Sequence, residues 1–156
     1  MKFYTSYYAK LSDLPDNFMK VSISRFPPDY IKNTLRLDIV NGDMLAPSKE
    51  LLSAFKNNEI DEQTYEKRYV IEVAENLSKK GYDSFQHYIE KVIYVYENEM
   101  ETKYDAIVFL CFEKPGEFCH RRTWAKIMQQ CGYNCPEYEF KKDKSNQEDK
   151  KTNSLF

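Results

Sequence analysis

The sequence carries little net charge. It has 23 lysines and arginines against 25 aspartates and glutamates in 156 residues, a formal charge of −2. Binding to duplex nucleic acid depends on neutralising many phosphates, and a nearly neutral chain supplies no strong field for that purpose. The composition therefore argues against duplex nucleic acid as a partner. It remains compatible with one nucleotide held at a local basic site.

The sequence also lacks a long hydrophobic run. No apolar signal follows Met1-Lys2, and no apolar stretch approaches the roughly 20 residues that a helix needs to cross a bilayer. We therefore expect a cytoplasmic protein with no membrane partner. The four cysteines are then expected to be reduced thiols rather than a disulfide framework.

Histidine and arginine are scarce, and they are concentrated in one place. The stretch from Asp105 to Cys131 holds one of the two histidines, two of the five arginines and three of the four cysteines. This stretch begins as an apolar run, breaks at Lys114-Pro115-Gly116 and gathers Cys119-His120-Arg121-Arg122 before a helical pattern. Such a concentration of reactive and charged side chains indicates a functional site.

Hydrophobic periodicity predicts an α/β fold. Strands are expected at Lys2–Tyr8, Met19–Ser24 and Ala106–Phe112, a helical turn at Leu11–Asn17, and a short last strand at Glu137–Phe140. Helices are expected to begin near Pro47-Ser48, Asp61, Asp83 or Ser84, and Arg122. The seven apolar residues from Ala106 to Phe112 are typical of a central parallel strand. Ile31–Asp43 is either a strand or an excursion off the sheet.

At this length we expect one domain. Residues 1–140 should form a single three-layer α/β domain with a small, mainly parallel sheet flanked by helices. Residues 141–156 are polar and rich in lysine, which predicts a disordered tail.

Useful side chains follow each predicted strand. Ligands of open parallel sheets bind beyond the carboxyl ends of the strands, so these side chains should meet at one edge. The first strand ends near Thr5, Ser6 and Tyr7, the second at Ser24 and Arg25, and the third at Cys111 and Glu113.

The predicted helix at Arg122 adds a reason to expect an anionic ligand. A helix N-terminus presents unpaired N–H groups and a partial positive charge, and Arg121 and Arg122 add fixed charge beside it. With Arg25, these groups should hold a small anion, for which we favour a nucleotide or nucleotide-derived molecule. They should equally stabilise a thiolate at Cys119.

The same loop offers candidates for catalysis. His120 and Glu113 are possible acid–base groups, and Cys119 is a possible nucleophile. Adjacent helical residues point about 100° apart, so Cys119 and His120 are not expected to form a hydrogen-bonded pair. Glu113 has an alternative role in a structural salt bridge with one of the two arginines. Cys111 has an alternative role as a buried core thiol.

A metal site is not favoured by the spacing. Zinc ligands can be drawn from Cys111, Cys119 and His120, or from Cys119 and His120 with Cys131 and Cys135, but the usual paired spacing is absent. Periodicity also assigns Cys131 to the core. A metal-binding protein using Cys119 and His120, or a non-catalytic module that sequesters its ligand, are the alternatives to an enzyme. The sequence identifies no cofactor.

The segment from Leu110 to Arg121, LCFEKPGEFCHR, resembles the C-terminal signature of the domain-of-unknown-function family numbered 488. Tyr4-Thr5-Ser6-Tyr7-Tyr8 is similar to the first strand of that family, and Ile23-Ser24-Arg25 with Pro27 and Pro28 is similar to its second. Leu45-Ala46-Pro47 before a helix, and Tyr65 and Tyr69 in the next, also match. The resemblance covers about residues 2 to 140. It implies a compact α/β domain with clustered signature residues, and neither a cofactor nor a reaction.

Overall fold

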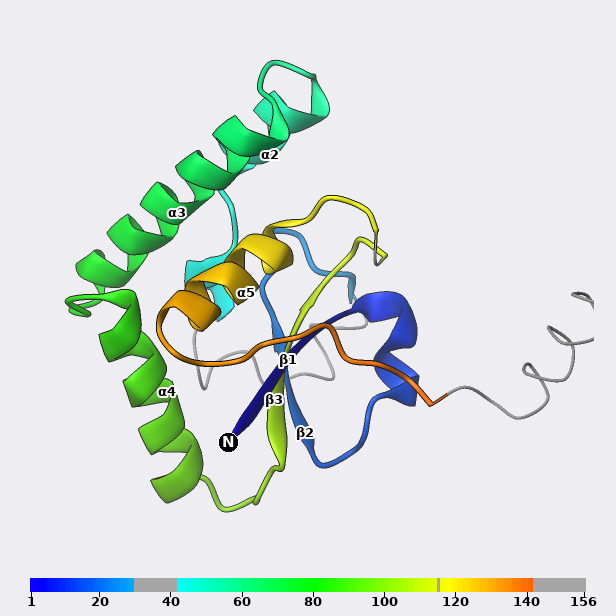
Figure 1. Ribbon diagram of the computed structural model, residues 1–156, viewed down its shortest axis with the longest axis vertical. Coiled ribbons are helices and arrows are strands. Elements are labelled where there is room, and N and C mark those ends of the chain that lie inside the picture. Colours follow the sequence, from blue (N-terminus) through cyan, green and yellow to red (C-terminus); the bar gives the residue numbers. More distant parts are fainter. Residues whose placement is uncertain (30–41, 115, 142–156) are drawn as a thin grey trace, which may run out of the picture.

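The computed structural model describes residues 1–29, 42–114 and 116–141 (Figure 1). Within these residues the strands β1 (Lys2–Tyr7), β2 (Phe18–Ser22) and β3 (Ala106–Cys111) form one sheet in the order β1-β3-β2. Both pairings are parallel. The predicted α/β class and parallel sheet are therefore confirmed, and the first three expected strands lie within two residues of their observed bounds.

The central strand explains its own sequence. All six residues of β3 are buried, because β1 and β2 flank it and both of its faces are covered. A strand in this position has no solvent-facing side, so it needs a continuous apolar run rather than an alternating one.

The helices begin where capping residues place them. They are α2 (Lys49–Lys56), α3 (Glu62–Lys79), α4 (Phe85–Asn98) and α5 (His120–Gln130), with 3-10 helices η1 (Tyr8–Asp13) and η2 (Gly42–Leu45). Ser48, Asp61 and Ser84 each accept a backbone N–H of the first turn that follows. Such caps satisfy donors that the helix itself leaves unpaired, so these three predicted starts are confirmed.

Two expected boundaries were wrong. The last helix, α5, begins at His120 rather than Arg122, with Cys119 as an extended N-cap residue. The expected strand Glu137–Phe140 is reduced to one parallel bridge between Glu137 and Thr5. Beyond this bridge Tyr138 and Phe140 pack their rings on an apolar cluster, so the chain is held by side chains rather than by a strand ladder.

Two predictions fall wholly or mostly outside the described residues. The segment Ile31–Asp43 is described only from Gly42 onward, and the tail only at Lys141. Neither the predicted strand or excursion nor the predicted disorder is tested.

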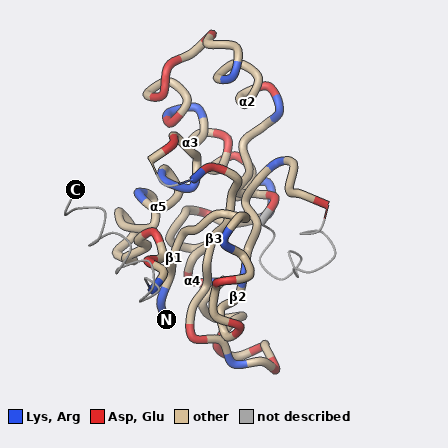
Figure 2. Tube along the Cα trace, turned by 90° about the vertical axis from the view of Figure 1, so that its right-hand side faces the viewer, with Lys and Arg blue, Asp and Glu red and all other residues tan. Residues whose placement is uncertain are grey.

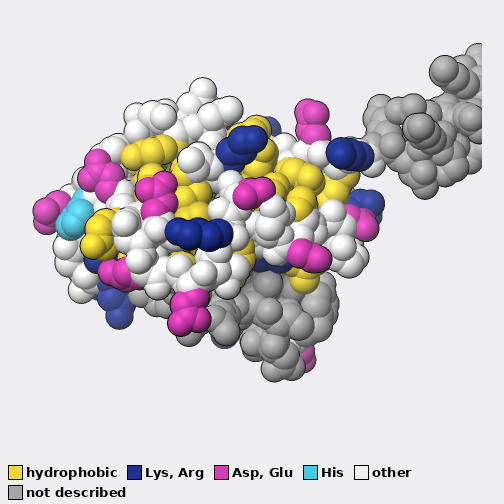
Figure 3. All heavy atoms as spheres, turned by 90° about the horizontal axis from the view of Figure 1, so that it is seen from below, with side chains coloured by type: hydrophobic (Ala, Val, Ile, Leu, Met, Phe, Trp, Pro, Cys, Tyr) yellow, Lys and Arg dark blue, Asp and Glu magenta, His cyan; other side chains and the backbone are white. Residues whose placement is uncertain are grey.

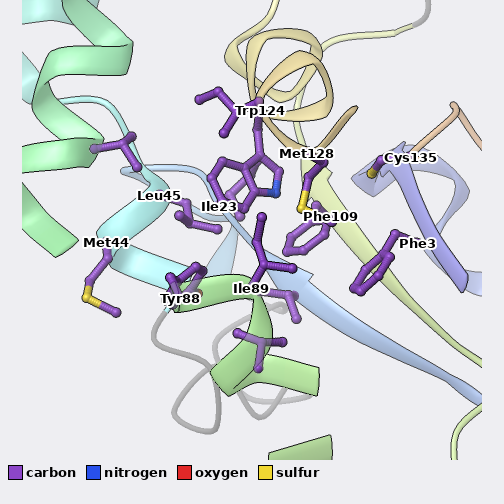
Figure 4. Packing of buried hydrophobic residues seen from close by; sticks show 14 of the residues in the cluster. Phe3, Ile23, Met44, Leu45, Tyr88, Ile89, Phe109, Trp124, Met128 and Cys135 are labelled. Atoms are coloured by element: carbon purple, nitrogen blue, oxygen red, sulfur yellow. The ribbon is translucent and has the colours of Figure 1, made fainter. Parts of the chain in front are cut away.

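The sheet separates two apolar clusters of unequal size. The larger lies on the face covered by α3, α4 and α5, where Trp124, Met128, Phe109 and Ile23 point toward one another (Figure 4). The smaller, around Tyr8, Leu14, Val108 and Leu110, lies under η1. Helices thus cover one face of the sheet, and η1 covers the other (Figure 1).

Charge is dispersed over the surface. Basic and acidic positions are interspersed along α2 and α3 (Figure 2), and charged and hydrophobic side chains mix on the face seen in Figure 3. In the described part of the chain no helix is both long and apolar enough to cross a membrane.

Candidate functional site

The carboxyl ends of the three strands lie at one edge of the sheet, beside the N-terminus of α5 (Figure 1). Tyr7 pairs with Cys111 in the register. The backbone N–H of Ile23 donates to the carbonyl of Leu110 over 3.0 Å, which carries β2 past its last ladder residue. The parallel topology therefore brings the three strand ends together, as the sequence predicted.

Strand alternation divides the predicted β1 residues between the two faces. Thr5 pairs with Phe109 and Tyr7 with Cys111, whereas Ser6 pairs with Leu110. Phe109 packs in the larger cluster beside α5 and Leu110 in the smaller one. Since paired residues share a face, Thr5 and Tyr7 lie on the side of α5 and Ser6 lies on the opposite side.

Arg121 is buried and its guanidinium is held within the protein. The residue is 1% exposed. Its Nη2 and Nε donate to the two carboxylate oxygens of Glu137 over 2.9 and 3.1 Å. Its Nη1 donates to Cys111 Sγ over 3.0 Å and to the carbonyl of Glu113. Arg121 therefore organises the junction from within rather than facing an external anion.

Glu137 is the site residue that sequence reasoning missed. Besides Arg121, its carboxylate accepts the hydroxyl of Thr5 over 2.5 Å, and backbone bonds on both sides of Glu137 anchor it to Thr5. No sequence signal singled it out, because its role depends on the chain returning past β1 after α5. The expected alternative, a salt bridge from Glu113 to Arg121 or Arg122, is not found among the described residues, and Arg121 pairs with Glu137 instead.

His120 is buried with a defined tautomer. Its Nε2 lies 2.7 Å from the carbonyl oxygen of Ile23, and a carbonyl only accepts, so Nε2 carries the proton and Nδ1 carries the lone pair. Burial lowers the pKa of His120 to about 4. The hydrogen bond to Ile23 opposes this shift, and the charge of Arg121 adds a smaller effect in the same direction as burial. The imidazole is thus neutral near pH 7.

The unprotonated Nδ1 of His120 faces Cys119. The two atoms are 3.9 Å apart, within hydrogen-bonding range for sulfur, so the expectation that these neighbours would not pair was wrong. It assumed that both residues are helical. Cys119 has φ −154° and ψ 145°, and the extended backbone turns its side chain toward the imidazole.

The structure joins Cys111 and Cys119 in a disulfide, so the expectation that all four cysteines are reduced thiols is wrong for this pair. When the pair is reduced, the thiol of Cys111 is placed to donate to the carboxylate of Glu113, 3.3 Å away. The Cα atoms of the two cysteines are 7.7 Å apart, beyond the roughly 7 Å above which a disulfide requires the backbone to move. The separation favours a pair of adjacent thiols over a permanent cross-link.

A pocket of about 330 Å³ opens above this junction. Its floor includes Cys119 and His120, and Glu113 and Glu117 contribute carboxylates. Five aromatic residues line its walls, namely Phe26, Phe55, Tyr65, Phe112 and Phe118.

The polar wall of the pocket comes from the segment that follows β2 and from the end of α2. Ser24, Arg25 and Lys56 line it. The hydroxyl of Ser24 is buried and has no hydrogen-bond partner among the described residues. Arg25 donates its Nε to the carbonyl of Pro47 over 2.9 Å, which fixes the stem of this exposed side chain.

The predicted site residues therefore separate into groups. Arg25, Glu113, Cys119 and His120 line the pocket. Thr5, Tyr7, Cys111 and Arg121 lie beneath it, with the Tyr7 ring 5.8 Å from the guanidinium. Arg122 is exposed on α5 and Ser6 faces the other cluster, so neither joins the lining.

The fold and the junction together define a small parallel α/β domain with a Cys-His-Arg cluster at the carboxyl edge of its sheet. The chain belongs to the DUF488 family, because the family model described as the active DUF488-N3 subclade matches residues 4–132. This confirms the resemblance seen in the sequence. Comparisons with curated proteins and with solved structures gave no match.

Proposed function

We propose that this protein binds a small anionic molecule, a nucleotide or a nucleotide-derived compound, in the pocket above the junction and acts on it chemically. The observation that carries the proposal is the combination in one pocket of aromatic walls, two cationic side chains and a thiol–imidazole floor.

The aromatic walls suit a planar group such as a nucleobase. Phe26 and Phe112 are 59% and 50% exposed although they are large apolar residues. Rings presented in this way offer stacking surfaces, and base–aromatic stacking contributes about 1–3 kcal/mol per base.

The cationic side chains suit a phosphate. Arg25 is anchored through Nε, and its terminal nitrogens have no hydrogen-bond partner in the described parts of the chain. Lys56 supplies a second positive charge from the end of α2. The unpartnered hydroxyl of Ser24 adds a donor beside them. Arg121 supports the ligand indirectly, by holding the floor of the pocket in place.

The floor supplies groups for a reaction. When Cys119 is reduced, His120 Nδ1 is placed to accept the proton of its thiol. Glu113 supplies a carboxylate at the pocket wall for acid–base work. The description of the matched subclade as active supports an enzyme over a sequestering module.

A thermal-shift screen with nucleotides and sugar phosphates tests the binding step. A ligand at about 100 times its Kd stabilises the folded state by about 2.7 kcal/mol, or roughly 5–10 °C in Tm for a chain of this size. Arg25→Ala and Lys56→Ala should each raise the Kd at least about ten-fold and so reduce the shift in Tm. Arg68→Ala is the matched control, since Arg68 is exposed on α3 and outside the lining. If none of the tested anions raises the Tm of the wild type, the proposal is refuted.

Recovery of the bound compound tests the reaction step. Incubation followed by chromatography should show conversion by the wild type and none by Glu113→Gln at similar affinity. If the wild type returns its ligand unchanged, the protein is a sequestering module.

A further inference from the structure

We propose that Cys111, Cys119 and His120 form a binding site for a zinc-type metal ion at the floor of the pocket. Their ligand atoms all lie within 4.8 Å of one another, and all three residues are buried. The inference deepens the proposed function, because it concerns the same pocket and assigns its two sulfurs a role.

The separations suit a tetrahedral site. Zinc bonds of about 2.3 Å to sulfur and about 2.0 Å to nitrogen place neighbouring ligand atoms roughly 3.5 Å apart. Cys119 Sγ and His120 Nδ1 are 3.9 Å apart. The Cys111–Cys119 bond would first take up two electrons and two protons from a thiol reductant, and the two sulfurs would then move apart to about 3.8 Å around an ion.

The cysteine backbone favours an ion over a disulfide. The Cα separation of 7.7 Å exceeds what a disulfide spans without movement of the chain. An ion placed between the sulfurs lengthens the link by two metal–sulfur bonds, so it tolerates this separation.

The surroundings of the ligands are already arranged. Histidines that bind metals usually donate their other ring N–H to a carbonyl or carboxylate, and His120 Nε2 does so to Ile23. Arg121 Nη1 donates to Cys111 Sγ, which stabilises negative charge on that sulfur. Because the Nε2 of His120 is occupied by Ile23, Nδ1 is the nitrogen left to coordinate the ion.

The charges also balance. Binding releases the protons of both thiols, and two thiolates neutralise a divalent ion. Arg121 is itself neutralised by Glu137 at 2.9 Å. The ion and its two thiolates are therefore neutral together, which avoids the large cost of an uncompensated buried charge. The carboxylate of Glu113 beside Cys111 is only partly buried and adds one negative charge at the pocket wall.

The donor set indicates the class of metal. Two thiolates and an imidazole favour zinc over magnesium or calcium, which prefer oxygen ligands. Three protein ligands leave a fourth position, as in catalytic zinc sites, and Cys119 and His120 border the pocket. With the ion bound, Cys119 acts as a ligand instead of a nucleophile, and Glu113 remains the acid–base group.

Metal analysis of the full chain, purified under reducing conditions without chelator or metal-affinity tag, tests the inference. We expect about one zinc per chain, falling at least about ten-fold in Cys111→Ser and in Cys119→Ser. Cys131→Ser is the matched control and should retain the metal. Equal zinc in all four proteins would overturn the proposal.

Cobalt titration of the wild type avoids any dependence on the folding of variants. Stoichiometric uptake with thiolate-to-cobalt charge-transfer absorption and the visible bands of a tetrahedral site is the expected result. No cobalt spectrum, or a Cys111–Cys119 disulfide that forms readily while the protein takes up no metal, would sink the assignment. Nucleotide binding measured in chelator separates this failure from failure of the proposed function.

Discussion

The first turn of α5 and the rest of the helix are buried to a similar degree for different reasons. His120 and Arg121 are 5% and 1% exposed, and Trp124 and Met128 are both 0% exposed. The first two are held by hydrogen bonds to β2, β3 and Glu137, whereas the last two pack in the apolar cluster (Figure 4). One helix is therefore anchored by hydrogen bonds in its first turn and by apolar packing further along.

The cysteines follow the same division. Cys119, at the start of α5, is bonded to Cys111 and lies beside the imidazole of His120. Cys111 in turn lies beside the carboxylate of Glu113 and the guanidinium of Arg121. Cys131 and Cys135, beyond the other end, pack with the apolar cluster, and burial raises the pKa of both thiols. The two proposals above therefore concern Cys111 and Cys119, and not Cys131 or Cys135.

The largest effect is expected where α5 is anchored. Trp124 contacts Phe85, Tyr88 and Phe109 at ring-centroid distances of 5.8 to 6.4 Å. Trp124→Ala should cost about 3–5 kcal/mol of unfolding free energy, measured by urea denaturation, because it leaves a cavity in the core.

Trp124→Phe is the control for that prediction. It keeps a ring and removes an indole N–H that has no partner among the described residues, so the loss should be only about 1 kcal/mol. Equal losses for both variants would show that the indole is not packed as the structure indicates.

A smaller loss is expected in the first turn. Arg121→Met strands the carboxylate of Glu137, which is 32% exposed. Breaking a fully buried pair costs about 3–5 kcal/mol, and the partial exposure of Glu137 should reduce this to about 2 kcal/mol. The same denaturation measurement applies.

A double-mutant cycle separates the ion pair from lost packing. Arg121→Met combined with Glu137→Gln should cost about 1 kcal/mol less than the sum of the two single variants. Additive losses would mean that the pair contributes no coupling, and the contrast between the two parts of α5 would then disappear.

An increase in stability is expected at the N-cap. Ser48, Asp61 and Ser84 cap α2, α3 and α4 through their side chains, whereas Cys119 makes no such bond. In metal-free protein whose cysteines are reduced, Cys119→Ser should therefore stabilise the fold by about 0.5–1 kcal/mol. Cys131→Ser, which loses apolar packing, should destabilise it slightly. A destabilised Cys119→Ser variant would indicate that the thiol serves the fold.

The least invasive test needs no substitution. Burial raises the pKa of Cys135 to about 12, and a raised thiol pKa disfavours the reactive thiolate, leaving roughly one molecule in ten thousand ionised at pH 8. Alkylation followed by peptide mass spectrometry should leave Cys135 unmodified in the folded protein and modify it in denaturant. Rapid labelling without denaturant would contradict its burial.

Local patterns were enough to predict most of the framework. The apolar run of β3, the capping residues of α2, α3 and α4 and the periodicity of α5 each act within a few residues of sequence, so they are visible without a fold. The edge at which Arg25, Cys111, Glu113 and Cys119 meet also followed, because parallel strands share their carboxyl ends. The location of the site was therefore predictable in outline.

What each residue does at that edge was decided by the tertiary structure. Whether Arg121 faces a ligand or a carboxylate depends on Glu137, which arrives only when the chain returns past Thr5. Whether Cys119 faces His120 depends on one extended backbone conformation at the start of α5. The sequence by itself determined the framework and the place of the site, because neighbouring residues encode them. Only the fold could assign the partners, because they come from segments far apart in the chain.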